Sequence, residues 1–232
     1  MSRCHMPQPP DLHVVDDPAS EVARLLADRA RRGGSIVLTG GSTPGAAYAR
    51  AAALEPDWSD VELWWGDERC VPPGDERSNY RLAKETLLDR VEGQPREVHR
   101  IRGELQPADA AGELDKALAG VELDLLLLGL GPDGHVASLF PGSPQLDVED
   151  RRATSGPAGL EPWVERVTMT MPTLRSAHRI VFLVTGEAKA DAVVRAFEGD
   201  ITREVPATLL RLAPVRVEAF LDGAAASRLG PG

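Results

Sequence analysis

The chain has 232 residues, of which 42% are hydrophobic and 27% charged, and a formal net charge of −10. This length suits one α/β domain or at most two small ones. The acidic balance, with a pI near 5.0, argues against binding nucleic acid or an anionic membrane through general electrostatics, although a few local donors can still bind a small anion.

The cysteines and the apolar runs indicate a cytosolic location. Cys4 and Cys70 are too few for a disulfide framework or a metal-ligand cluster, which fits a reducing compartment. The first residues, MSRCHMPQPPD, lack the apolar stretch of a signal peptide. The longest aliphatic run, Leu125–Leu128, is far too short to cross a bilayer. We therefore expect a cytoplasmic protein that binds no membrane.

Strand-like and helix-like patterns alternate along the chain. After Asp17-Pro18, the segment ASEVARLLADRARR has the period of an amphipathic helix that ends at residues 33–34. The further predicted strands are SIVLT, VELWW, residues 98–101, LDLLLLGL, RVTMT, RIVFLVT and VRVEAFL. The further predicted helices are TPGAAYARAAAL, SNYRLAKETLLDR with Ser78 as its N-cap, and residues 108–118, 187–197 and 207–212.

The order of these elements predicts the fold class. LDLLLLGL is too uniformly apolar for a half-exposed strand, so it is expected to be a central parallel strand covered on both faces. Repeated β-then-α units predict an α/β fold, an open and mainly parallel Rossmann-like sheet with helices on both faces. We expect one domain over residues 1–232, with residues 1–11 as a flexible N-terminus. In such folds ligands bind at the carboxyl ends of the strands.

The first strand ends in TGGSTPGAAYA, a turn suited to a phosphate. Gly40 and Gly41 let the backbone approach a ligand, and Ser42 and Thr43 offer hydroxyl groups. The free N–H groups and the dipole of the following helix favour an anion. A capped strand-to-helix turn without a ligand is an equal alternative. The turn is neither a dinucleotide fingerprint nor a P-loop, which disfavours a nucleotide.

Three other strand ends carry groups capable of chemistry. Asp67, Glu68 and Arg69 follow VELWW, where a charge triplet read alone is usually a solvated face. The central strand runs into GLGPDGHVASLFPG, in which Asp133 and His135 share a short loop. A neutral imidazole at a cleft is well suited to moving protons near pH 7, although a single histidine is more often structural. Lys189 lies in the first turn of a later helix, a position that a bound phosphate explains.

Taken together, six segments resemble the 6-phosphogluconolactonase family, within the wider glucosamine-6-phosphate isomerase-like superfamily. They occur in family order over most of the chain, and the DGHVASLFPG string is the specific one. The resemblance implies an enzyme, a carboxylic ester hydrolase of the pentose phosphate pathway that opens 6-phosphogluconolactone, without a metal or organic cofactor. The matching segments are GGSTP at 40–44, GDERCVP at 66–72, SNYRLA at 78–83, LGLGPDGHVASLFPG at 128–142, RVTMT at 166–170 and VTGEAKA at 184–190.

The resemblance also implies roles for individual residues. His135 is expected to be the general base that activates water, with Asp133 orienting its imidazole or holding the loop. Arg69 is expected to bind a substrate oxygen or the oxyanion of the tetrahedral intermediate. The resemblance places the 6-phosphate near Gly40 and Gly41, on Ser42, Thr43 and Lys189, with Asp67 as a carboxylate organising the cleft and Arg166 as a further substrate contact. No G-x-S-x-G elbow suggests a covalent route, and Ser138 is interpreted as packing or capping its loop.

Two other functions compete with lactone hydrolysis. A sugar-phosphate aldose–ketose isomerase of the same superfamily carries a Glu five residues after the His and tends to have Tyr at the position of Arg69. Here the first of these positions is Phe140, which cannot transfer a proton. A sugar-phosphate-sensing domain of a transcription regulator needs a DNA-binding segment, for which too few residues precede the first helix. We expect a monomer that acts on a small phosphorylated sugar lactone and binds no nucleic acid.

Overall fold

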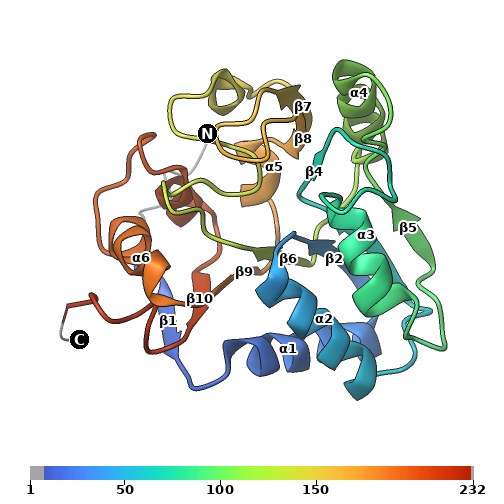
Figure 1. Ribbon diagram of the computed structural model, residues 1–232, viewed down its shortest axis with the longest axis horizontal. Coiled ribbons are helices and arrows are strands. Elements are labelled where there is room, and N and C mark those ends of the chain that lie inside the picture. The colour runs from blue at the N-terminus through green and yellow to red at the C-terminus, as the bar shows by residue number, and fades with distance from the viewer. Residues whose placement is uncertain (1–7, 231–232) are drawn as a thin grey trace.

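The computed structural model describes residues 8–230 of the protein. Of the N-terminus predicted to be flexible, residues 1–7 lie outside the described residues, and Asp11 already begins the first strand. A parallel sheet of seven strands organises the described chain, in the order β1-β10-β9-β6-β2-β3-β5 (Figure 1). Its strands are β1 (Asp11–Val14), β2 (Gly34–Leu38), β3 (Val61–Trp65), β5 (Glu97–His99), β6 (Leu125–Leu128), β9 (Ile180–Val184) and β10 (Val217–Leu221).

The central position of β6 confirms the interpretation of its sequence. It pairs in parallel with β2 on one side and with β9 on the other. All four of its leucines are buried. When helices cover both faces of a strand, the side chains on both faces are apolar. The sequence of such a strand therefore does not alternate between apolar and polar residues. The open, parallel α/β fold predicted from the sequence is therefore confirmed.

Helices flank the sheet, and two of the described helices start at a capping side chain. Asp17 accepts a hydrogen bond from the Ser20 backbone N–H at the start of the first helix, and Ser78 does the same for Arg81. The α-helices are α1 (Pro18–Arg32), α2 (Ser42–Leu54), α3 (Asn79–Ala83), α4 (Pro107–Ala117), α5 (Met171–Arg175) and α6 (Ala190–Phe197). A π-helical turn, η1 (Lys84–Leu88), continues α3, and the 3-10 turns are η2 (Pro144–Asp147), η3 (Glu187–Lys189) and η4 (Pro206–Leu212).

A second, antiparallel sheet in the order β4-β8-β7 lies beyond the carboxyl end of β3. Its strands are β4 (Asp67–Arg69), β7 (Ala153–Gly156) and β8 (Arg166–Met169). Gly66 connects the two sheets, because its N–H donates to the carbonyl of Leu38 in β2 and its carbonyl accepts from Met169 in β8. The predicted strand RVTMT is therefore a strand of this small sheet and not of the parallel one.

Some elements differ from their sequence predictions. Strands β1, β4 and β7 were not predicted, since each has four residues or fewer and none is uniformly apolar. The predicted helix at 187–197 begins as the 3-10 turn η3, and the predicted helix at 207–212 is the 3-10 turn η4. Over residues 8–230, we find no helix with the length and apolar character needed to cross a membrane.

Candidate active site

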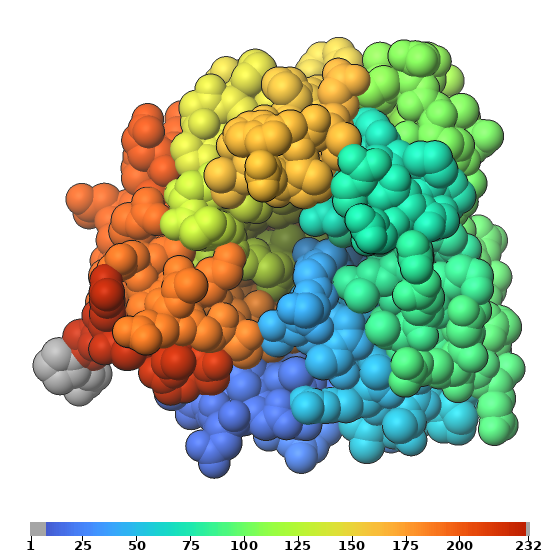
Figure 2. Space-filling view, in the orientation of Figure 1, coloured from blue at the N-terminus to red at the C-terminus, as the bar shows by residue number. Residues whose placement is uncertain are grey.

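A cavity of about 400 Å³ opens at the carboxyl ends of the parallel strands. Figure 2 shows it as a hollow near the centre of the molecule, between segments far apart in the sequence. Its wall comes from the turn after β2, from β4 and α3, from the loop after β6, from the segment leading into β8, and from η3. The structure therefore brings together seven of the ten predicted site residues as its lining: Gly40, Gly41, Asp67, Arg69, His135, Arg166 and Lys189.

His135 and Asp133 form a close pair at the end of β6. The Nδ1 atom of His135 lies 2.6 Å from Oδ1 of Asp133, which also accepts the His135 backbone N–H at 3.1 Å. Burial opposes ionisation of Asp133, but its bonds to His135 hold the pKa of this carboxyl below its ordinary value. A carboxylate only accepts hydrogen bonds, so the ring proton is on Nδ1 and the lone pair of Nε2 remains available as a base.

Local backbone geometry sets the position of the His135 ring. A Cβ on Gly131 would lie 2.0 Å from Nδ1, so only glycine leaves room for the imidazole. Gly134 has a φ of 91°, a value that glycine adopts without strain. Ala137 lines the cavity with a φ of 48°, in the left-handed region that non-glycine residues rarely occupy. Strain of this kind occurs where surrounding structure fixes the backbone for function.

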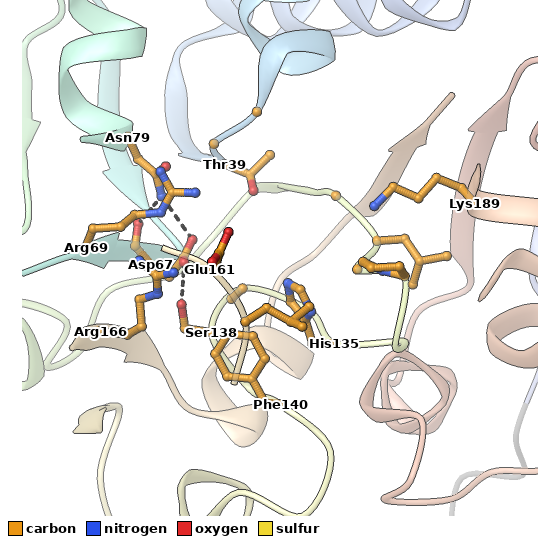
Figure 3. Close-up of a pocket in the computed structure, with 18 residues that line it drawn as sticks. Thr39, Asp67, Arg69, Asn79, His135, Ser138, Phe140, Glu161, Arg166 and Lys189 are labelled. Atoms are coloured by element: carbon orange, nitrogen blue, oxygen red, sulfur yellow. Dashed lines mark hydrogen bonds between the residues drawn. The ribbon is translucent and has the colours of Figure 1, made fainter. Parts of the chain in front are cut away.

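Asp67 and Glu68 are buried and fully engaged, unlike a solvated charge triplet. Oδ2 of Asp67 accepts the Ser138 hydroxyl at 2.6 Å, and its Oδ1 accepts Nδ2 of Asn79 at 3.2 Å (Figure 3). Glu68 accepts from the Ser78 hydroxyl and from the backbone N–H groups of Arg69, Asn79 and Tyr80. Ser138 thus holds its loop in place, as its interpretation as a packing residue predicted.

Arg69 and Arg166 are opposite each other in the antiparallel pair of β4 and β8. Arg166 is 4% exposed, donates through Nη2 to the carbonyl of Pro162 at 2.9 Å, and has no partner for Nη1 among the described residues. Burial, and then the charge of Arg69, lower the pKa of Arg166, although Asp67 opposes this. Two neighbouring guanidinium groups on the wall of a cavity favour an anion there.

The turn after β2 and Lys189 form the opposite side of the cavity. Gly41, with a φ of 110°, precedes α2, and within the described chain no side chain caps that helix. Its first N–H groups are therefore free for an anion. The ammonium of Lys189 points towards the cavity (Figure 3), and burial lowers its pKa, with Asp133 opposing.

The two hydroxyl residues of the turn are arranged differently from the sequence expectation. Ser42 and Thr43 begin α2 but do not line the cavity. Oγ1 of Thr43 lies 2.9 Å from Oγ1 of Thr185, a contact that joins the turn to the end of β9. The lining at this turn comes from Thr39, Gly40 and Gly41.

Several lining residues were not identified from the sequence. Asn79 lines the cavity from the start of α3, although its segment was recognised only as a helix start and as part of the family resemblance, with no site role for Asn79. Leu160 and Glu161 line it from the segment before β8, where no motif marks them. Phe140, singled out in the sequence only for lacking a transferable proton, is buried in the lining, and the centre of its ring lies 4.6 Å from that of His135. Within residues 8–230 there is no group of three or more His, Cys, Asp or Glu side chains arranged to hold a metal ion.

Comparison with known proteins shows the family of the chain. Residues 12–218 match the family described as glucosamine-6-phosphate isomerases/6-phosphogluconolactonase. The chain is 37% identical over 228 residues to a 6-phosphogluconolactonase of Streptomyces coelicolor, a match that covers 90% of this chain and 87% of the relative. It is 34% identical over 219 residues to the probable 6-phosphogluconolactonase 1 of Arabidopsis thaliana, covering 84% of this chain and 81% of that one.

Solved structures give the same fold. The 6-phosphogluconolactonase of Trypanosoma brucei superposes with a TM-score of 0.82 at 28% identity, over 95% of this chain and 99% of the other. A monomeric glucosamine-6-phosphate deaminase superposes with a TM-score of 0.83 at 20% identity, covering 94% and 99% of the two chains. The second likeness shows the fold alone.

The fold and the cavity define an open α/β protein with a cavity at the carboxyl ends of its strands, where ligands bind in folds of this class. Within that class, the chain belongs to the glucosamine-6-phosphate isomerase/6-phosphogluconolactonase family.

Proposed function

We propose that the protein hydrolyses 6-phospho-D-glucono-1,5-lactone to 6-phosphogluconate, a carboxylic ester hydrolysis in the pentose phosphate pathway. The observation that carries the proposal is the His135–Asp133 pair facing a cavity that also contains two arginines and a lysine. The names of the relatives, which are 6-phosphogluconolactonases in bacteria, a plant and a trypanosome, support the same reaction.

In this mechanism His135 acts as a general base. Its Nε2 takes a proton from a water molecule, whose oxygen forms a bond to the lactone carbonyl carbon. The resulting tetrahedral intermediate carries a negative oxygen, which Arg69 stabilises. When the intermediate collapses, the bond between this carbon and the ring oxygen breaks, and the ring oxygen takes the proton from the His135 imidazolium, which returns to the neutral imidazole. Asp133 stabilises the imidazolium formed in the first step, because it already accepts the Nδ1 proton.

The phosphate is anchored on the side of Lys189 and the Gly40–Gly41 turn. The uncapped start of α2 supplies N–H donors, and Ser42 and Thr43 form its first residues. We assign Arg166 to substrate binding beside Arg69, since its Nη1 is buried without a partner in the described chain. Asp67 organises the cleft through Ser138 and Asn79.

Both sheets are inferred to form one domain, because both contribute residues to the cavity. One chain supplies every group that this mechanism uses, which supports a monomer as the active form. The acidic charge and the small number of cysteines support a cytoplasmic enzyme that does not bind nucleic acid.

An isomerase of the same family is the alternative reaction, and one residue argues against it. Such enzymes need a proton-transferring carboxylate where this chain has Phe140. The Phe140 ring is buried against His135 and offers no proton to a sugar ring.

The test is a direct assay on freshly prepared 6-phosphogluconolactone, corrected for spontaneous hydrolysis, with glucosamine 6-phosphate run in parallel. We expect opening of the lactone and no deamination or isomerisation of the amino sugar. Activity on glucosamine 6-phosphate alone would overturn the proposal.

A further inference from the structure

Asn79 is the first residue of α3 and is 2% exposed, yet the oxygen of its side-chain amide has no hydrogen-bond partner in the described chain. Its Nδ2 donates to the backbone carbonyl of Asp67 at 2.9 Å and to Oδ1 of the same residue at 3.2 Å. Both partners are acceptors, so they fix which end of the amide is nitrogen. Oδ1 is then the buried atom that lacks a hydrogen bond in the described chain.

The free Oδ1 packs against the turn after β2. A Cβ on Gly40 would lie 2.0 Å from Oδ1 and 2.7 Å from Cγ of Asn79. Gly40 is not among the glycines with positive φ, so alanine could adopt its backbone conformation. The close approach of the Asn79 amide is therefore the reason for a glycine at this position.

The same amide is connected to the loop of His135. The Oδ1 atom of Asp67 accepts the hydrogen bond from Nδ2 of Asn79. The Oδ2 atom of the same carboxylate accepts the Ser138 hydroxyl at 2.6 Å (Figure 3). Ser138 is in the loop that carries His135. One side of Asn79 thus contacts the turn at Gly40, and the other side is bonded to a carboxylate that holds the catalytic loop.

The backbone of Asn79 is itself fixed. Glu68, which is 2% exposed, accepts the Asn79 N–H at 2.8 Å and the Tyr80 N–H at 2.8 Å. Its Oε2 also accepts the Ser78 hydroxyl at 2.9 Å. A side chain with this support keeps its neighbours at a fixed spacing.

We propose that Asn79 is a positioning residue that fixes the distance between the Gly40–Gly41 turn and the loop of His135. The inference rests on the proposed function, in which the turn binds the phosphate and His135 performs the chemistry. Binding of the phosphate then places the lactone carbonyl opposite His135, so that anchoring energy is used for orientation. Asn79 contributes to kcat and not to the affinity for phosphate.

The test compares Asn79→Ala, Gly40→Ala and the double variant, with Gly112→Ala as a matched control. Gly112 is in α4, where a Cβ would meet nothing within 4 Å. For Asn79→Ala and for Gly40→Ala we expect kcat on the phosphorylated lactone to fall on the order of tenfold to a hundredfold, as for a small misplacement of substrate. For Asn79→Ala, which leaves the phosphate turn itself intact, inhibition by inorganic phosphate should change by less than about twofold. Gly112→Ala should match the wild type.

The double variant distinguishes positioning from two separate roles. Gly40→Ala acts by displacing the Asn79 amide, which Asn79→Ala has already removed. The combined loss of kcat should therefore be no larger than the larger single loss, whereas two independent roles would give losses that multiply. Asn79→Asp keeps the volume but loses the Nδ2 donor, so it should lose at least as much kcat as Asn79→Ala.

Three results would overturn the inference. The first is a double variant whose loss of kcat is the product of the two single losses, and the second is full activity of Asn79→Asp. The third is an Asn79→Ala variant with weaker inhibition by phosphate and an unchanged kcat. If the variants lose kcat in proportion to their drop in melting temperature, and regain it at low temperature, Asn79 has a purely structural role and the inference is wrong. Failure of the proposed function would appear separately, as a wild type without lactonase activity. The coupling between Gly40→Ala and Asn79→Ala in melting temperature, which needs no substrate, still tests the contact in that case.

Discussion

The imidazole of His135 can act as a base because its other nitrogen is already occupied. Asp133 holds Nδ1, Gly131 leaves space for the ring, and the Phe140 ring packs beside it at a tilt of 47°. The sequence predicted His135 and Asp133 from a short loop after a buried strand. It predicted a helix starting at this turn, but not that Ser42 and Thr43 lie outside the cavity lining, since that depends on where the turn bends.

His135→Ala should lower kcat on the phosphorylated lactone by about 10² to 10⁴, the usual contribution of a general base. The phosphate anchor does not involve this side chain, so inhibition by inorganic phosphate should persist. Steady-state kinetics with and without inorganic phosphate measure both quantities. An unchanged rate of lactone opening would remove His135 from the mechanism.

Lys189 should give phosphate binding an alkaline limit. Burial lowers its pKa, so the ammonium loses its proton at a lower pH than an ordinary lysine does. Inhibition by inorganic phosphate should therefore weaken with rising pH at a lower pH than an ordinary lysine, with a pKa of about 10.4, would give. In Lys189→Arg the guanidinium stays charged, and the alkaline weakening should disappear. An identical pH profile in both proteins would argue against the anchor.

At the scale of elements, the three-residue strand β4 has the greatest influence on the site. Asp67 is bonded to the catalytic loop, Glu68 to the start of α3, and Arg69 lines the cavity. Read from the sequence, these three charges resemble a solvated turn, because nothing local reveals the donors that α3 brings to them. The long apolar strand β6, by contrast, could be predicted from its own residues.

Replacing Glu68 should destabilise the link between β4 and α3. Glu68→Ala leaves four donors without their acceptor, namely the N–H groups of residues 69, 79 and 80 and the Ser78 hydroxyl. We expect the free energy of unfolding to fall by about 2–4 kcal/mol. Urea denaturation measures this change, with Glu85→Ala as a control, since Glu85 forms an exposed pair with Arg81. Equal effects of the two substitutions would contradict the role of Glu68.

At the scale of the whole molecule, the cavity is formed only when distant segments of the chain come together. Alternating strand and helix patterns were enough to predict the parallel sheet and the edge at which ligands bind. They were not enough to place β8 in a second sheet, because a short antiparallel strand has the same local sequence pattern as a parallel one. The position of Arg166 opposite Arg69 follows from that pairing and could be seen only in the structure.

The centre of the parallel sheet should determine global stability without affecting chemistry. Leu126 is fully buried in β6, so Leu126→Ala should lower the free energy of unfolding by about 2–5 kcal/mol through loss of burial and a cavity. KM and kcat of the folded enzyme at low temperature should stay near those of the wild type. Leu54→Ala, at a side chain that is 48% exposed, is the matched control. A comparable loss in both variants, measured by urea denaturation, would contradict this.

The pairing of β1 with β10 has a consequence for how the protein is made. The first strand and the last strand of the described chain are neighbours, and β10 also covers one edge of β9. During synthesis, the apolar strand β9 emerges from the ribosome before β10, the strand that covers its edge. Strand β1 emerges earlier still and also stays unpaired until β10 is made. Until then two unpaired edges are open to other nascent chains, which is a recognised route to aggregation. Asp222, directly after β10, accepts the N–H of Gly186 just before η3, so the loop of Lys189 is also secured only after β10 has emerged.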